Sequence, residues 1–325
     1  MSPKLDPDLA RVVSASRSRD LVHRCPDHLA AMLSGEALVK LGRWREAGRL
    51  ELGDVGALVL WTKQPASIVE CVELRSALER YVGGGGLVAL QLTVTGFGGT
   101  PVEPGIPRPE EVAAALARIV EAGIVEPRAV KLRYDPVGTI VFEGLPAYTN
   151  ASVDRFEEVL DLFQPLGVER VTASRLDDWN YPAVAERIAN VGGRLEPVGD
   201  GEAEAFMRRL AGACRERGMV YSTCVHPVDD ELVGVEGCID GRVMNGWIRE
   251  RGGRPVWDAL HNAVGSQRPG CQCTYSVDIG SSPGVPMCSS GGFGCLYCYA
   301  QGAGVGRDVR AKVEELLREA RASRR

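Results

Sequence analysis

Histidine is scarce in this chain, and this scarcity removes one large class of metalloenzymes. Only four of the 325 residues are histidine, and they are His23, His28, His226 and His261. No two of them are four residues apart, the spacing at which one helix face presents two imidazoles to a metal ion. We therefore do not expect a histidine-based metal hydrolase.

Long apolar runs and a strong charge of one sign are also lacking. The stretch from Met1 to Asp8 is polar and has no apolar segment of a signal peptide, and no run elsewhere is long enough to span a bilayer. The 38 basic and 43 acidic residues nearly balance, so nothing indicates bulk attraction to a polyanion. We expect a cytoplasmic protein without a membrane partner and without nucleic acid as its partner.

Cysteine, by contrast, is abundant, with ten residues that are not expected to form disulfides in a reducing compartment. Three of them, Cys288, Cys295 and Cys298, lie within eleven residues of a glycine-rich segment. Three thiolates can hold three irons of a four-iron cluster and leave the fourth open to chelate a small molecule, whereas an electron-carrying cluster normally has four cysteines. The alternatives are a zinc half-site, a redox-active Cys-x2-Cys pair and incidental thiols.

A second group of cysteines consists of Cys224, Cys238, Cys271 and Cys273. All four fall near expected strand ends or just before the last expected strand, so they can converge on one site for a second iron–sulfur cluster or zinc. The single residue between Cys271 and Cys273 is shorter than the usual spacing at structural zinc sites. Of the other three, Cys71 and Cys214 fall in helical patterns, which predicts small core residues, and Cys25 has no partner by spacing.

The fold class follows from apolar runs that alternate with helical periodicity. Strands are predicted over 11–16, 56–60, 87–92, 129–132, 170–173, 219–222 and 273–277, and helices over 67–82, 108–122, 152–163, 202–217 and 307–322. This alternation predicts an α/β fold with a parallel sheet, and polar residues after the strands favour a (β/α) barrel or partial barrel with its site at that end. We expect a single domain over 1–325, with 271–300 as its cysteine-rich, cluster-binding segment.

Charged and polar residues directly after the predicted strands are candidates for substrate binding or proton transfer. They are Lys63, Arg133, Asp135, Arg175, Asp177 and His226. A structural alternative is that ion pairs such as Arg133 with Asp135 only close the mouth of the barrel.

Five motifs carry a resemblance to a known family over nearly the whole chain. They are Ser14-Ala15-Ser16-Arg17, Trp61-Thr62-Lys63-Gln64-Pro65, Arg133-Tyr134-Asp135-Pro136, Gly237-Cys238-Ile239-Asp240 and Asp278-Ile279-Gly280. The chain resembles the uncharacterised family catalogued as domain of unknown function "eighteen forty-eight", whose C-terminal cysteines are described as similar to the cluster motif of radical S-adenosylmethionine (SAM) enzymes. The spacing here, Cys-x6-Cys-x2-Cys, is three residues longer than the usual Cys-x3-Cys-x2-Cys of those enzymes.

The resemblance implies a radical SAM-type enzyme with a 4Fe–4S cluster on Cys288, Cys295 and Cys298 and SAM at the open iron. It further implies a small-molecule substrate, whose identity the sequence does not give, and an electron donor such as flavodoxin or ferredoxin. Radical SAM enzymes carry the cluster loop after their first strand, whereas this chain carries it after its last predicted strand, which implies a circular permutation.

On this view the end of the first strand lies where SAM is held. The SAM-binding candidates are Ser16, Arg17, Arg19 and Asp20, and their alternative is a surface salt-bridge cluster. Two other functions stay open. One is a non-enzymatic iron–sulfur or zinc-binding protein for electron transfer or redox sensing. The other is a lyase acting on nucleic acid, suggested by a similarity of residues 294–299 to spore photoproduct lyase.

Overall fold

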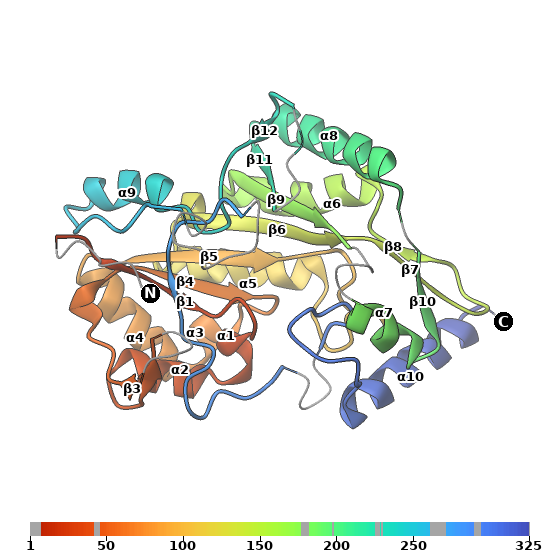
Figure 1. Cartoon of the computed structure of the whole chain (residues 1–325), viewed down its shortest axis with the longest axis horizontal. Helices are drawn as coiled ribbons and strands as arrows, with labels where there is room; N and C mark the ends of the chain where they lie inside the picture. Colours follow the sequence, from red (N-terminus) through yellow and green to blue (C-terminus); the bar gives the residue numbers. More distant parts are fainter. Residues whose placement is uncertain are drawn as a thin grey trace.

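A parallel sheet of eight strands forms the centre of the fold in the computed structural model (Figure 1), which describes residues 8–41, 46–176, 182–196, 198–224, 228, 230–260, 271–288 and 294–324. The strand order is β12-β11-β9-β6-β5-β4-β1-β13. Their bounds are β1 (Arg11–Ala15), β4 (Val55–Thr62), β5 (Leu87–Thr93), β6 (Val130–Val137), β9 (Arg170–Arg175), β11 (Val220–Thr223), β12 (Val233–Gly234) and β13 (Val277–Asp278).

Every neighbouring pair in this sheet is parallel, from the pair β11 and β12 to the pair β1 and β13. Successive strands from β1 to β12 are added at one edge, while β13 adds at the other edge beside β1. This order is compatible with a barrel-like fold. Within the described residues, however, no ladder joins β12 to β13, so closure of the sheet is not observed. The predicted α/β class and parallel sheet are confirmed.

All seven predicted strands lie in this sheet, but the last was predicted too early and too long. Strand β13 begins only at Val277. Upstream of it the backbone is bonded elsewhere, because Thr274 N donates to Ile239 O at 2.9 Å and Tyr275 N donates to Ala259 O at 2.8 Å. The segment that carries Cys271 and Cys273 is therefore a loop fixed to two other loops rather than part of a strand.

Ten helices are found in the described part of the chain. They are α1 (Leu21–Arg24), α2 (Pro26–Leu33), α3 (Ser67–Glu70), α4 (Val72–Gly83), α5 (Pro109–Glu121), α6 (Val153–Phe163), α7 (Pro182–Ala189), α8 (Asp200–Glu216), α9 (Gly241–Glu250) and α10 (Arg307–Ala322). Short 3-10 turns occupy Leu52–Asp54, Pro127–Ala129 and Gln164–Leu166. The five predicted helices match α3 with α4, α5, α6, α8 and α10, while α1, α2, α7 and α9 were not predicted.

The predicted helix over 67–82 divides at Cys71, which has extended backbone angles and caps α4 by accepting the N–H of Leu74 on its sulfur at 3.4 Å. The prediction of Cys71 as a core residue was therefore wrong, because a capping side chain lies at the helix end and stays half-exposed. Cys214 is fully buried in α8, as predicted. The caps of two other helices follow common rules, with Pro109 at the start of α5 and Ser152 at the N-cap of α6.

A smaller antiparallel sheet, β10-β7-β8, adds a second apolar cluster that was not predicted. Its strands are β7 (Thr139–Phe142), β8 (Tyr148–Thr149) and β10 (Gly193–Glu196), and a separate hairpin pairs β2 (Val39–Lys40) with β3 (Ala47–Gly48). Figure 1 shows α7, α10 and β10 together beside the main sheet. The buried residues of this cluster include Phe142, Ile188, Leu195, Leu296, Tyr297, Val313 and Leu317. The C-terminal cysteine segment is thus packed between α7 and α10.

None of the helices in the described ranges combines the length and the apolar character that a membrane crossing requires.

Asn150 fixes the corner at which β6 turns into β7, and its replacement tests that packing. Its Oδ1 accepts from Gly138 N at 2.8 Å, and its Nδ2 donates to Thr95 O at 3.0 Å and Pro136 O at 2.9 Å. Because each buried polar group left unpaired costs ~1–3 kcal/mol, we expect Asn150→Ala to lower the free energy of unfolding by ~2–4 kcal/mol in urea denaturation. The control Asn190→Ala removes one exposed hydrogen bond to Ala303 O, and it should change the free energy of unfolding by less than ~1 kcal/mol. Equal losses in the two variants would contradict this account.

Candidate functional site: two groups of cysteines

The three cysteines of the C-terminal segment lie near the carboxyl ends of β1 and β4, among charged side chains. The sulfur of Cys288 accepts the backbone N–H of Asp20 at 3.1 Å, and Cys298 N donates to Cys295 O at 3.1 Å. Burial raises the pKa of Cys288 to about 11 and raises the pKa values of Cys295 and Cys298 as well. Charge on Cys298 acts on Cys288 and on Cys295, and charge on Cys288 acts on Cys295, so the three predicted ligands lie within electrostatic range of one another.

A buried guanidinium shapes the loop that carries two of these thiols. Arg187 of α7 is 2% exposed, and it donates to the carbonyls of Cys298 at 2.5 Å, Gly302 at 2.9 Å and Leu296 at 3.2 Å, and to that of Gln301. No carboxylate pairs with it in the described part of the chain. Burial lowers the pKa of Arg187, and negative charge on Cys298 and Cys295 opposes that shift. Arg187 is thus a buried cation on which these two sulfurs act favourably when they are ionised.

A second positive charge, on the largely covered Lys63, lies near Cys295. Lys63, directly after β4, donates from Nζ to Glu103 Oε1 at 2.7 Å and to Tyr297 Oη at 2.8 Å, and Tyr297 Oη also donates to Glu103. Burial opposes the charge of Lys63, but Glu103 and then Cys295 outweigh it, so its pKa is raised. The ammonium is therefore held beside Cys295 as a permanent cation.

The second group of cysteines also converges. Cys238, Cys271 and Cys273 form a buried cluster, and Cys224 and Trp61 pack against it. The thiols of Cys224 and Cys273 are the main cause of a pKa of Cys238 far below its usual range. The thiol of Cys273 likewise lowers the pKa of Cys271 to about 6. We name these four residues the four-cysteine group.

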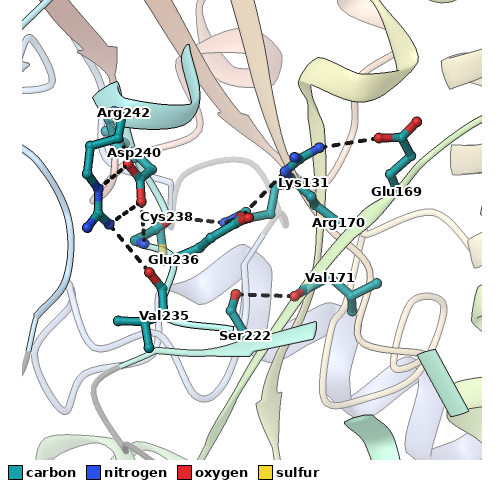
Figure 2. Close-up of polar contacts among 12 residues, drawn as sticks. Lys131, Glu169, Arg170, Val171, Ser222, Val235, Glu236, Cys238, Asp240 and Arg242 are labelled. Atoms are coloured by element: carbon teal, nitrogen blue, oxygen red, sulfur yellow. Dashed lines mark hydrogen bonds and ion pairs between the residues drawn. The ribbon is translucent and has the colours of Figure 1, made fainter. Parts of the chain in front are cut away.

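The loop that carries Cys238 is fixed by polar contacts to the main sheet (Figure 2). Lys131 of β6 donates to Glu236 Oε2 at 3.1 Å and to Gly237 O at 2.8 Å, and Asp240 pairs with Arg242 at the start of α9. In addition, Gln91 of β5 donates to Cys238 O at 2.5 Å. Both the side chain and the carbonyl of Cys238 are therefore held by neighbouring strands of the sheet.

Trp61, at the end of β4, lies beside the four-cysteine group. Its ring packs on the four-cysteine group, and two guanidinium groups lie near it, that of Arg133 at 5.0 Å from the ring centroid and that of Arg17 at 5.8 Å. Arg133 also donates from Nη1 to Cys238 Sγ at 2.8 Å. Lys63, two residues after Trp61, contacts the C-terminal segment. One strand end thus presents a side chain to each group.

All four predicted SAM-binding residues have partners within the protein, and Ser16, Arg19 and Asp20 are held by their side chains. Ser16 Oγ donates to Asp278 Oδ1 at 2.5 Å, Arg19 Nη1 donates to Val285 O at 2.8 Å, and Asp20 accepts from Thr62 Oγ1 at 2.9 Å and Lys63 N at 3.0 Å. Burial raises the pKa of Asp20 to about 6.

Arg17 differs from these three residues. Its backbone N donates to Asp278 and its Nη2 to Ser276, but its buried Nε finds no hydrogen-bond partner among the described residues. Arg17 therefore keeps one donor for a ligand.

The predicted strand-end residues do not all meet at one place. Arg133 and Asp135 form an ion pair beside the four-cysteine group, and Ser174 Oγ donates to the same carboxylate. Arg175 instead reaches the exposed Asp200 at the start of α8, at 2.5 Å. Asp177 and His226 lie outside the described residues.

Sequence reasoning missed Trp61, Glu103, Arg187 and Tyr297 as site residues. Only for Arg187 was a usable signal present, since it falls three residues after the buried Val184 and beside the buried Ile188, on the apolar face of a short helix. A charged residue at such a position is a candidate for an internal role.

The spacing of potential ligand atoms bears on which metal each group can hold. In the residues the structure describes, three such atoms lie within 4.8 Å of one another only at Asp27, Cys71 and Glu73, where the thiol donates to Asp27 Oδ1 at 3.0 Å. Neither group of cysteines brings three sulfurs to that spacing. Two thiolates on one tetrahedral zinc are ~3.8 Å apart, so both groups are more open than a zinc site.

Replacing Arg187 tests whether it organises the cysteine loop. Arg187→Met leaves four carbonyls without this donor, one of them the buried Leu296 O, so we expect a loss of ~2–4 kcal/mol in unfolding free energy and faster amide hydrogen exchange over residues 294–302. Arg187→Lys keeps the positive charge but loses the planar guanidinium. Its unfolding free energy and its loop exchange rates should therefore fall between those of Arg187→Met and the native protein. The exposed Arg194→Met is the control. Unchanged exchange over the loop in Arg187→Met would refute the role.

Comparison with known proteins adds a family. A search of curated proteins finds no match. Among solved structures, the D-hydantoinase from a Bacillus sp. AR9 matches at 12% identity with a TM-score of 0.27, a likeness too slight to carry an argument. The match covers 63% of this chain and 39% of the hydantoinase. The family described as "Domain of unknown function (DUF1848)" matches residues 12–300, and the chain belongs to this family.

Proposed function

We propose that this protein is a radical SAM-type enzyme that holds a 4Fe–4S cluster through Cys288, Cys295 and Cys298 and binds SAM at the open iron. The observation that carries the proposal is the buried Arg187. A buried charge without an opposite charge is costly, and the carbonyls that Arg187 contacts are neutral. Three thiolates with a four-iron core carry net negative charge, and such a group beside Cys295 and Cys298 would compensate Arg187.

The donor set fits an iron–sulfur cluster better than zinc. A four-iron cluster is a multi-atom body that separates its ligands, whereas one zinc ion draws its thiolates together. The three sulfurs are near enough to act on one another's charge but are not drawn to the zinc spacing. The number of cysteines is also three rather than four, which leaves one iron without a protein ligand.

Arg17 is the residue best suited to hold the carboxylate of SAM. Its Nε is buried and unpaired, and its carbonyl accepts the hydroxyl of Tyr299, the residue after Cys298, at 3.1 Å. Arg17 is thereby tied to the cluster loop. The neighbouring β13 lies beside β1, which brings the loop after the last strand to the end of the first. This adjacency supports a barrel-like arrangement in which the cluster unit has been moved from the first to the last strand by circular permutation.

In this function the protein binds and orients, and the bound groups supply the chemistry. The cluster, reduced by a donor such as flavodoxin or ferredoxin, would supply the electron that splits SAM into methionine and a 5′-deoxyadenosyl radical. Arg17 would hold the carboxylate of SAM, and Lys63 with Glu103 and Tyr297 would pack one side of Cys295 without admitting water. Arg133 and Asp135 lie in β6, beside the four-cysteine group, where they would contact a small-molecule substrate.

A second candidate function is a non-enzymatic iron–sulfur or zinc-binding protein for electron transfer or redox sensing. The observation in its favour is that Ser16, Arg19 and Asp20 already have partners within the protein. The two functions differ in whether the iron site responds to SAM.

Electron paramagnetic resonance (EPR) of the anaerobically reconstituted, dithionite-reduced protein separates them. We expect a reduced-cluster signal that shifts when SAM is added, and this SAM-responsive signal should be lost in Cys295→Ala/Cys298→Ala. The control Cys25→Ala should keep both the signal and its shift. A spectrum in which no signal responds to SAM would favour the electron-transfer function, and zinc without iron would exclude the cluster.

The role of Arg17 is tested by SAM affinity in protein with a full cluster. A hydrogen bond to a charged group is worth ~1.5–3 kcal/mol, so Arg17→Ala should weaken SAM binding ~10- to 100-fold by calorimetry. Arg19→Ala, which removes the neighbouring guanidinium bonded to Val285 O, should change the affinity less than threefold. Equal affinities for Arg17→Ala and the native protein would refute the assignment.

A further inference from the structure

We propose that the four-cysteine group binds a second 4Fe–4S cluster, with all four irons held by protein thiolates. This site is separate from the Cys288 loop and does not depend on SAM binding there. Its ligands come from three segments, namely Cys224 after β11, Cys238 before α9, and Cys271 with Cys273 before β13. The fold brings all four thiols to one buried place beside Trp61.

Backbone contacts hold the segments that carry these ligands close together. Thr274 N donates to Ile239 O at 2.9 Å, and Gly241 N donates to Thr274 Oγ1 at 2.9 Å. Gly237 approaches so closely that a Cβ there would lie 2.5 Å from Gln272 O and 2.6 Å from Cys273 Cα. Cys238 therefore lies against the Cys271–Cys273 loop, because the close backbone contact at Gly237 leaves no space for a Cβ atom.

The charges around the four-cysteine group suit an anionic cluster. Four thiolates with a four-iron core carry net negative charge, which must be compensated in a buried place. Arg133 donates to Cys238 Sγ at 2.8 Å, and Lys131 lies on the other side of the Cys238 loop, with its Nζ 2.8 Å from Gly237 O. Arg17 adds a third positive charge near the face of Trp61. Asp135 and Glu236 neutralise these cations only in part.

The geometry favours an iron–sulfur cluster over zinc. Among the described residues no three of the four sulfurs lie within 4.8 Å of one another, so they are not drawn to the spacing of ligands on one zinc ion. One residue separates Cys271 from Cys273, fewer than the two to four of structural zinc sites. With four cysteine ligands no iron is open to a substrate, and the expected role is to take up and return one electron.

The test isolates this site by removing the other one. The full-length variant Cys288→Ala/Cys295→Ala/Cys298→Ala is reconstituted anaerobically with iron and sulfide, and its folding is checked by circular dichroism. We expect it to retain about four irons and four sulfides per chain and to gain an EPR signal when dithionite adds one electron. Adding Cys238→Ala and Cys271→Ala in the same background should remove both iron and signal. Adding Cys25→Ala and Cys71→Ala instead should remove neither.

Three outcomes would overturn the proposal. They are a folded triple variant without iron, a triple variant that holds one zinc per chain and no cluster, and iron that persists after Cys238 and Cys271 are replaced. None of these results depends on whether the Cys288 loop binds a cluster, so failure here is distinguishable from failure of the proposed function.

A variant that keeps all four ligands gives a second, independent measurement. Arg133→Met removes the hydrogen bond to Cys238 Sγ and a nearby positive charge, both of which favour the reduced cluster. In the background that lacks the Cys288 loop ligands, we expect full iron content and a more negative reduction potential. The exposed Arg194→Met should leave the potential unchanged. An unchanged potential in Arg133→Met would show that the iron is not at Cys238.

Discussion

The hydrogen bonds of one buried guanidinium determine how the C-terminal cysteine segment meets the rest of the molecule. Arg187 reaches from α7 to the carbonyls of four residues between Leu296 and Gly302, a stretch with little regular structure of its own. A loop without ladder or helix bonds needs outside partners for its polar backbone, and here one side chain supplies most of them. The apolar cluster of β7, β10, α7 and α10 in turn holds Arg187 in place. The smaller sheet β10-β7-β8 therefore supports this loop.

Parallel strands explain why the two groups of cysteines lie at the same end of the molecule. The carboxyl ends of such strands meet at one edge, so the residues after β1, β4, β6, β11 and β13 become neighbours although they are far apart in the sequence. The end of β4 illustrates the consequence. Trp61 and Lys63 are two residues apart, and they contact the four-cysteine group and the C-terminal segment respectively.

The sequence allowed seven of the eight strands of the main sheet to be predicted, because the central strands β4 and β5 are mostly apolar, as expected for strands buried on both faces, and the others carry shorter apolar runs. The two groups of cysteines could be predicted because clustered thiols are chemically conspicuous. Glu103, Tyr297 and Arg187 could not, because their roles arise from contacts across the fold, such as the 194 residues between Glu103 and Tyr297. The division of the helix at Cys71 and the late start of β13 were missed for a related reason, since local side-chain and loop hydrogen bonds prevailed over the apolar pattern there.

Strand β13 joins the main sheet late in the synthesis of the chain. Strand β1 is made first, but its neighbour β13 follows only after 262 residues, as measured by the hydrogen bond from Ser16 to Asp278. Until then one edge of β1 has no partner, and an unpaired edge is a template for wrong pairing. The last strand covers this edge and, in the same step, delivers the segment with Cys288, Cys295 and Cys298 to the end of β1. Translation of nearly the whole chain therefore precedes assembly of that site, and a nascent chain stalled before β13 would expose an open sheet edge and contain none of these three thiols.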